Sequence, residues 1–177
     1  FQPLIDTLRA LNMRFGLWFE PEMINEDSDL HRAHPDWVLG PADQIRGRNQ
    51  LHLDMARDDV QAYLFDRLGG ILAAWEIDYV KWDHNRLTPH PDAAQTRGVY
   101  ALLDRLRAAH PQVEFESCAS GGGRIDAGIL TRCGRVWLSD SNDALERLRI
   151  QHHAAMLLPA CVTGSHVGPR DCHTSHR

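Results

Sequence analysis

The sequence predicts an α/β fold in which short strands and longer amphipathic helices alternate around a parallel sheet. Two observations predict this class. The apolar pattern switches repeatedly between short runs rich in β-branched and aromatic residues and longer stretches with helical spacing. Acidic, aromatic and glycine residues also cluster directly after the predicted strands, at the edge where barrel enzymes hold their catalytic residues. With 177 residues and 43% hydrophobic content, the chain forms one domain or part of one.

The first half of the chain begins its alternation with a strand at residues 15–19, which have the apolar and aromatic composition of a strand. A short extended piece follows at residues 51–54. Residues 58–75 carry apolar side chains along one side at helical spacing, and two aspartates in the first turn suit the positive end of the helix dipole. The next predicted strand covers residues 79–83.

The second half repeats this alternation, and no Pro/Ser-rich linker divides it. The units number about five, so a closed eight-strand barrel of ~250 residues needs more chain than this. The start at Phe1, with a helix-then-strand pattern and no leader, is expected of an excerpt from a longer protein. The predicted helices are residues 92–109, 125–131 and 144–157, and the predicted strands are residues 113–118 and 136–140, with a final apolar run at 160–163.

The composition excludes several classes of function. A net charge of −5 without a basic stripe argues against nucleic acid as a partner. No apolar run reaches the ~20 residues of a membrane-spanning helix, so no membrane partner is expected. The four cysteines are widely spaced and form no CxxC pair, which favours free thiols in a reducing cytoplasm over a zinc ribbon or a disulfide framework.

A lysine and an aspartate stand together at the end of the strand at residues 79–83. Side chains alternate across a strand, so Lys81 and Asp83 share one face. The ammonium group favours the ionised form of Asp83, which suits a nucleophile, and it can still donate to a substrate hydroxyl. The alternative is a structural ion pair at a strand end.

A second carboxylate, Asp140, ends the strand at residues 136–140. Ser141, Asn142 and Asp143 follow it, and one polar residue is expected to cap the next helix. We therefore expect Asn142 or Asp143 to be the cap and Asp140 to face the site. The alternative is that both aspartates are cap and surface residues.

An aromatic residue lies in the first predicted strand, and two glutamates follow that strand. Trp18 can cover the apolar face of a sugar ring, although a buried tryptophan is commonly part of the core. Glu20 and Glu22 are expected to shape the site by pairing with basic groups such as Arg48 or Arg124.

The histidines form no metal motif, and neither a metal nor another cofactor is predicted. His152 and His153 are neighbours on a helix and point in different directions, while His166, His173 and His176 lie near the C-terminus without an HExxH pattern. Metal-dependent hydrolysis through these histidines stays open as an alternative. The three glycines at 121–123 lack the Lys-Ser/Thr ending of a phosphate loop.

Six ordered stretches carry a resemblance that spans nearly the whole chain. They closely resemble the bacterial α-galactosidases of glycoside hydrolase family 36. The resemblance implies a (β/α)8 TIM barrel that cleaves terminal α-linked galactose from raffinose-type oligosaccharides with net retention. The stretches are GLWFEPEM, HPDWVL, GRNQ, DYVKWDHNR, ESCASGGGRID and WLSDSNDALERLRIQ.

The resemblance also implies roles for single residues. Asp83 is similar to the family's nucleophile and Asp140 to its acid/base, a pair that retaining hydrolysis holds about 5 to 5.5 Å apart. Asp140 is then expected to be kept protonated in a drier setting. Cys118 and Gly121 are expected near the sugar 2-hydroxyl. The residues that resemble substrate contacts are Trp18, Arg48, Lys81, Asn85, Cys118 and Gly121.

Some features depart from the family pattern. His84 replaces a common Met, SDSND stands where SDNTD is frequent, and the connection after Arg86 is short. The family's Asp-Asp-Gly-Trp segment is absent. Residues 1–177 are therefore expected to be a partial catalytic barrel of about five to six βα units, without the N-terminal β-sandwich, the first and last barrel strands and the C-terminal domain.

The partner expected from the resemblance is an α-galactoside oligosaccharide, and a homo-oligomer is allowed for the full-length protein. Two other functions stay open. One is a transglycosylase of the same superfamily, which passes galactose to another sugar through the same two carboxylates. The other is a sugar-binding fragment without turnover, because an unclosed barrel leaves strand edges unpaired.

Overall fold

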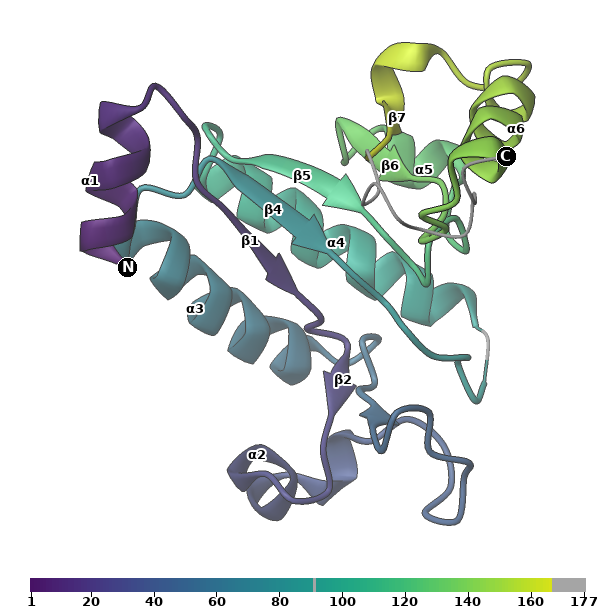
Figure 1. Cartoon of the computed structure of the whole chain (residues 1–177). Coiled ribbons are helices and arrows are strands. Elements are labelled where there is room, and N and C mark those ends of the chain that lie inside the picture. The colour runs from purple at the N-terminus through teal and green to yellow at the C-terminus, as the bar shows by residue number, and fades with distance from the viewer. Residues whose placement is uncertain (91, 167–177) are drawn as a thin grey trace.

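A parallel sheet forms the centre of the molecule in the computed structural model, which describes residues 1–90 and 92–166. The sheet has five strands in the order β1-β4-β5-β6-β7, and every pair is parallel (Figure 1). Among the described residues, β1 and β7 each pair on one side only, so the sheet is an open part of a barrel. The strands are β1 (Gly16–Phe19), β4 (Tyr79–Trp82), β5 (Glu114–Ser117), β6 (Arg135–Trp137) and β7 (Thr163–Gly164).

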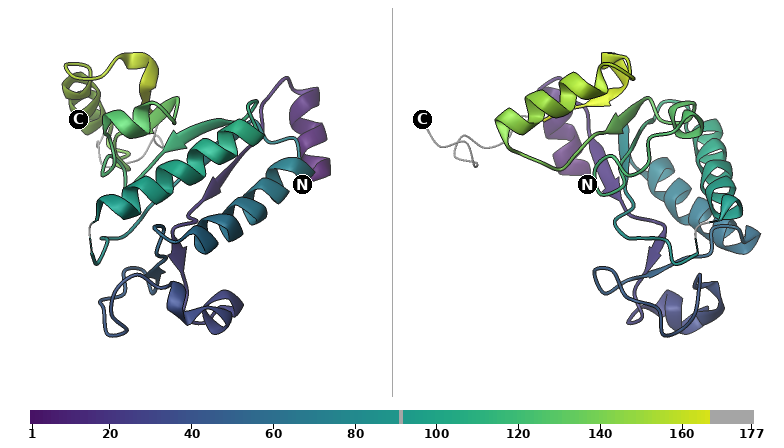
Figure 2. Two further views of the ribbon diagram at one scale, coloured as in Figure 1. Left: turned by 180° about the vertical axis from the view of Figure 1, so that it is seen from behind. Right: turned by 90° about the vertical axis from the view of Figure 1, so that its right-hand side faces the viewer.

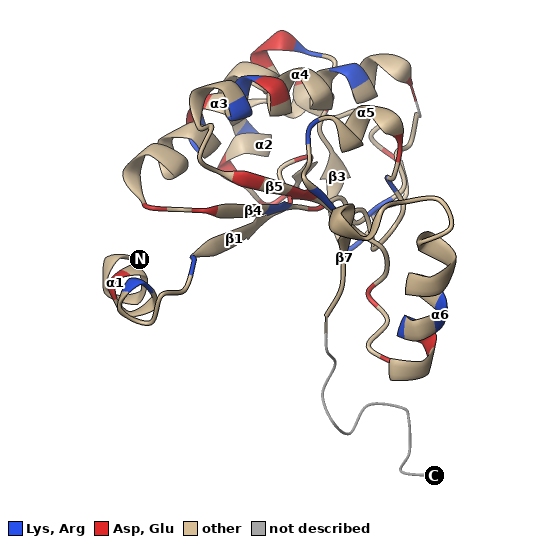
Figure 3. Cartoon of the chain, turned by 90° about the horizontal axis from the view of Figure 1, so that it is seen from above, with Lys and Arg blue, Asp and Glu red and all other residues tan. Residues whose placement is uncertain are grey.

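Helices connect the parallel strands, and the two longest pack side by side against one face of the sheet (Figure 2). They are α3 (Asp58–Ala74) and α4 (Ala93–Ala109). The strand side chains that face them are buried, as Val80 and Trp82 of β4 show. Acidic and basic residues are interspersed along α3 and α4 (Figure 3). The other helices are α1 (Gln2–Ala10), α5 (Ala127–Leu130), α6 (Ala144–Ala154) and the 3₁₀ turn η2 (Ala160–Val162).

The opposite face of the sheet, which we call the inner face, carries polar and aromatic side chains. Strand register places Trp18 beside Lys81 and Lys81 beside Glu116. Lys81 is half-buried, and an open hollow of about 430 Å³ lies over this face. Alternation of side chains along each strand thus separates an apolar face packed on helices from a polar face.

A separate subdomain is inserted between β1 and α3. It contains β2 (Met23–Ile24) and β3 (Leu51–His52), which pair antiparallel, and it also contains α2 (Asp29–Ala33) and the 3₁₀ turn η1 (Pro35–Trp37). The extended piece predicted at residues 51–54 is therefore real, but it belongs to this small sheet rather than to the parallel one. The insert lies beyond the end of β1 (Figure 1).

The sequence did not predict β2, α2 and η1 of the insert. The order of the other elements is confirmed, and their differences from the prediction lie at element ends. The strand expected at residues 136–140 ends at Trp137, because the chain then turns toward the cap of α6. The helix expected to reach residue 157 ends at Ala154. The final apolar run forms η2 followed by β7. None of the described helices is long and apolar enough to cross a membrane.

Candidate active site

Asp83 lies directly after β4, at the carboxyl end of the parallel sheet, and its side chain is buried. Its Oδ2 accepts hydrogen bonds from Trp18 Nε1 at 2.9 Å and from Asn85 Nδ2 at 2.6 Å. Its Oδ1 accepts from the backbone N–H of His84 at 2.8 Å, and the Cys118 thiol also hydrogen-bonds the carboxylate. The group is therefore surrounded by donors.

This environment keeps Asp83 ionised. Burial raises the pKa of Asp83, but the hydrogen bonds from Asn85, Trp18, Cys118 and the His84 N–H outweigh it and hold the pKa below its usual value. The thiol of Cys118 remains a donor, because burial raises its pKa to about 12.

Lys81 does not provide the ion pair with Asp83 that the sequence suggested. Its Nζ lies 3.6 Å from Oε1 of Glu116 and 3.7 Å from the centre of the Trp137 ring. The expected pairing is wrong because Glu116, on the neighbouring strand in direct register with Lys81, is the nearer carboxylate. Lys81 still lies on the inner face of the sheet, two residues before Asp83.

Asp140 follows β6, and its Oδ1 accepts a hydrogen bond from Trp137 Nε1 at 2.9 Å. The neighbouring Asp143 caps α6 by accepting from the N–H of Glu146 at 2.8 Å. The expectation that Asn142 or Asp143 is the cap is thus confirmed, and the cap is Asp143. The expectation of a dry setting for Asp140 is wrong in this structure, because its side chain is exposed.

The loop after β5 connects the surroundings of the two aspartates. Cys118, at its start, hydrogen-bonds Asp83. Gly121, with φ of +82°, packs so closely that a Cβ there would lie 2.9 Å from Cα of Ser139 and 3.3 Å from the backbone N of Asp140. A continuous rim of contacts therefore runs from Asp83 through Cys118 and Gly121 to Asp140.

Three other predicted contacts, Asn85, Arg48 and Trp18, have polar partners. Ser120 Oγ donates to Asn85 Oδ1 at 3.2 Å, which turns the Asn85 amide nitrogen toward Asp83. Arg48 Nη1 lies 3.3 Å from Oε1 of Glu20, as the sequence suggested, and more than half of the Arg48 side chain is exposed. Trp18 is half exposed at the edge of the sheet while its indole N–H is bound to Asp83.

A largely buried group that sequence spacing did not reveal includes His84, the residue after Asp83. Glu22, His52 and His84 bring one ligand-type atom each to within 4.8 Å of one another. Glu22 pairs with Arg124 at 2.8 Å, as expected, and burial lowers the pKa of His52 to about 4. These residues are about 30 positions apart along the chain, so no local motif marks them.

Of the histidines noted in the sequence, His152, His153 and His166 are not part of this group. His152 and His153 are exposed on α6, with ring centres 5.7 Å apart, and His166 stacks on Trp137. His173 and His176 lie outside the described residues.

The comparisons with known proteins agree with one another. A family model described as Melibiase matches residues 1–177. The chain is 48% identical to the α-galactosidase of Escherichia coli, covering 99% of this chain and 26% of that protein. Its structure is similar to the galactosidase domain of the α-galactosidase–sucrose kinase AgaSK, with a TM-score of 0.89 and 42% identity. The match covers 99% of this chain and 25% of that one. The AgaSK that matches in sequence is from Mediterraneibacter gnavus.

A third similar structure contains a sugar. It is a variant of the α-galactosidase AgaA from Geobacillus stearothermophilus in complex with stachyose, with a TM-score of 0.88, 36% identity and coverage of 99% and 26% of the two chains. The chain thus spans about a quarter of the length of these relatives. Because the family model matches the whole chain and the fold agrees, the chain belongs to the melibiase family, as its resemblance to glycoside hydrolase family 36 predicted.

Proposed function

We propose that the full-length protein containing this chain is a retaining α-galactosidase that releases terminal α-linked galactose from raffinose-type oligosaccharides. Residues 1–177 supply part of its catalytic barrel, and further domains complete it. The observation that carries the proposal is the buried carboxylate of Asp83, which is fixed by donors on both oxygens at the carboxyl end of a barrel strand. The names of the relatives and the stachyose complex of AgaA support the substrate class.

Asp83 is the nucleophile in this proposal. The donors on Oδ1 and Oδ2 hold the carboxylate in one orientation and keep it ionised, so that it attacks the anomeric carbon of the galactosyl group. A covalent galactosyl ester forms as the bond to the leaving-group oxygen breaks.

Asp140 is the acid/base. In the first step it donates a proton to the departing oxygen, and in the second it removes a proton from the water that attacks the ester. Its exposure suits a group that must meet the leaving group, exchange a proton and then meet water. The contacts through Cys118 and Gly121 support a shared position for the two carboxylates at the rim.

The galactose contacts in this proposal are Trp18, Arg48, Lys81, Asn85, Cys118 and Gly121. Trp18 offers a half-exposed ring beside Asp83, which suits packing against the apolar face of a sugar. Lys81, whose ammonium lies on the inner face, is a donor for sugar hydroxyls.

A slow fluorinated galactosyl substrate tests the nucleophile directly. The full-length protein is incubated with this reagent, digested and examined by mass spectrometry for the peptide that carries the sugar. The label is expected on Asp83, and a label on any other residue would overturn the assignment. Analysis of the products released from raffinose then distinguishes hydrolysis from transfer of galactose to another sugar.

A further inference from the structure

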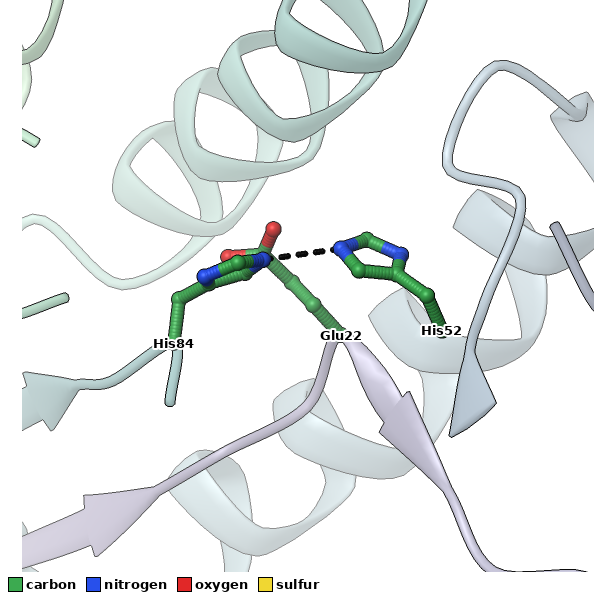
Figure 4. A group of neighbouring side chains, drawn as sticks. All are labelled: Glu22, His52 and His84. Carbon is green, nitrogen blue, oxygen red and sulfur yellow. Dashed lines mark hydrogen bonds between the residues drawn. The ribbon is translucent and has the colours of Figure 1, made fainter. Parts of the chain in front are cut away.

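We propose that Glu22, His52 and His84 form a binding site for a divalent transition-metal ion, with Zn²⁺ as the best match. The three side chains come from the segment after β1, from β3 and from the segment after β4, and they converge on one another (Figure 4). Two imidazole nitrogens and one carboxylate oxygen are a donor set that zinc enzymes use, with water as the fourth ligand.

The two histidines already face each other with the atoms that a metal would use. Nε2 of His52 and Nε2 of His84 are 2.8 Å apart, so a single proton lies between them (Figure 4). Nδ1 of His52 lies 2.7 Å from the carbonyl oxygen of Leu53, which can only accept, and 3.0 Å from Nε2 of Gln95, which itself donates to that carbonyl at 2.8 Å. We therefore assign the His52 proton to Nδ1, which leaves a lone pair on Nε2 and makes His84 the donor.

A metal ion can take the place of that shared proton. His84 would carry its proton on Nδ1 instead, and the rings would separate slightly to admit bonds of about 2.0 to 2.1 Å. The carbonyl of Leu53 fixes the tautomer and orientation of His52, as outer partners of metal-bound histidines commonly do.

Glu22 is held in a way that leaves one oxygen for the metal. Its Oε1 accepts from Trp82 Nε1 at 2.7 Å and from Arg124 Nη1 at 2.8 Å. In the part of the chain that the structure describes, no protein hydrogen bond engages Oε2. The carboxylate is thus fixed by its first oxygen while the second is free to coordinate.

A neighbouring cavity accommodates the fourth ligand. It has a volume of about 180 Å³ and is lined by all three proposed ligands and by Arg124. Nε and Nη2 of Arg124 are buried without a hydrogen-bond partner among the described residues. A water molecule or small anion on the metal would give these donors an acceptor and offset the positive charge of Arg124 beside the cation.

The proposed site is linked to the active site by one peptide group. The backbone N–H of His84 donates to Oδ1 of Asp83 at 2.8 Å. Metal binding by the His84 ring would therefore act on the same residue that orients the proposed nucleophile. Zinc binding does not depend on the proposed function. Only an effect of zinc on turnover rests on that proposal.

The test uses the full-length protein, freed of metal with a chelator and titrated with ZnCl₂ by calorimetry. We expect one additional Zn²⁺ per chain to bind to the wild type compared with the His84→Met variant, whose flexible side chain fills the same space. Loss of a ligand is expected to weaken this binding by at least about tenfold. The matched control replaces the exposed His152 and His153 with Ala and should retain the binding.

Diffraction shows where the zinc ion binds, which titration alone does not. Crystals of the wild-type protein soaked in ZnCl₂ should show an anomalous peak at the zinc edge between Glu22, His52 and His84. This measurement needs no variant, so misfolding of His84→Met cannot confuse it. Absence of a peak there, or equal zinc affinity in the His84→Met variant, would overturn the site. The galactosyl label on Asp83 can still be obtained in that case, so the two proposals fail separately.

Discussion

At the scale of single residues, Asp83 and Asp140 have different environments, and each environment suits a different role. Asp83 is buried and accepts hydrogen bonds on both oxygens, which favours a permanent negative charge. Asp140 is exposed and receives one hydrogen bond on Oδ1, from Trp137. A fixed carboxylate suits attack on carbon, and an accessible one suits proton exchange.

Replacing Asp140 with Ala should remove proton donation without removing the nucleophile. Turnover of raffinose by the full-length protein should fall by about 10²- to 10⁴-fold, while a substrate with a good leaving group such as a nitrophenyl galactoside should lose much less in its first step. Kinetics on both substrates measure this difference.

The nearby Asp143 provides the matched control, because it caps α6. Asp143→Ala should reduce the free energy of unfolding by about 1 kcal/mol and affect both substrates alike. Equal losses on both substrates in Asp140→Ala would contradict its role as an acid.

At the scale of elements, the loop after β5 and the helix α1 show how local contacts position the strands. The loop holds Cys118 against Asp83 and packs Gly121 on the segment that carries Asp140. Helix α1 is joined to the start of β4 by Arg9, whose Nη1 lies 2.8 Å from Oδ2 of Asp78. That same oxygen accepts from the N–H of Phe15 at 2.7 Å.

Gly121→Ala should damage both the loop and the activity. The residue has φ of +82°, and the added Cβ would lie 2.9 Å from Cα of Ser139, so the segment carrying Asp140 must shift. We expect a loss of kcat larger than the loss of stability, measured by kinetics and thermal unfolding of the full-length protein. Gly70→Ala on α3 is the control, because a Cβ there meets nothing within 4 Å, and it should stabilise the helix by about 0.5 to 1 kcal/mol. Unchanged kcat in Gly121→Ala would contradict the positioning argument.

Asp78 should make stability depend on pH in acid. Burial raises its pKa, but the hydrogen bonds from Arg9 and from the N–H of Phe15 outweigh it, so the pKa is lowered on folding. The stabilisation is therefore present above the unfolded value of about 3.9 and is lost as pH falls through the lowered folded pKa. Asp78→Asn should cost about 1 to 3 kcal/mol at pH 7 and progressively less below pH 4.

Chemical denaturation of the full-length protein between pH 3 and pH 7 measures this dependence. Asp66→Asn, at an exposed position on α3, should leave the pH profile of the wild type unchanged. A constant difference between Asp78→Asn and wild type across this range would show that Asp78 does not titrate as described.

At the scale of the whole molecule, the alternation of strands and helices could be predicted, because apolar periodicity follows directly from which faces are buried. Asp83 and its neighbours were predicted as site residues because ordered motifs mark them. The pairing of Lys81 with Glu116 was missed, since strand register brings together residues 35 positions apart. The group of Glu22, His52 and His84 was missed for the same reason, as only folding joins its three segments.

The open sheet leads to a prediction about the isolated chain. In the described residues, β1 and β7 have one unpaired side each, and large apolar side chains such as Leu148 and Leu157 are exposed. Residues 1–177 expressed alone should therefore associate or aggregate. Size-exclusion chromatography and thermal unfolding test this, with the full-length protein as the control. A monomer that unfolds cooperatively would show that the chain is a self-sufficient unit.

The protonated, enclosed sulfur of Cys118 has a consequence for chemical reactivity. Oxidants and alkylating reagents attack the thiolate form, and the raised pKa of about 12 leaves almost none of it at neutral pH. A cysteine thus lies beside Asp83 in a form that reacts slowly with oxidants. Of the cysteines in the described part of the chain, Cys161 is exposed, so electrophiles would reach it before Cys118.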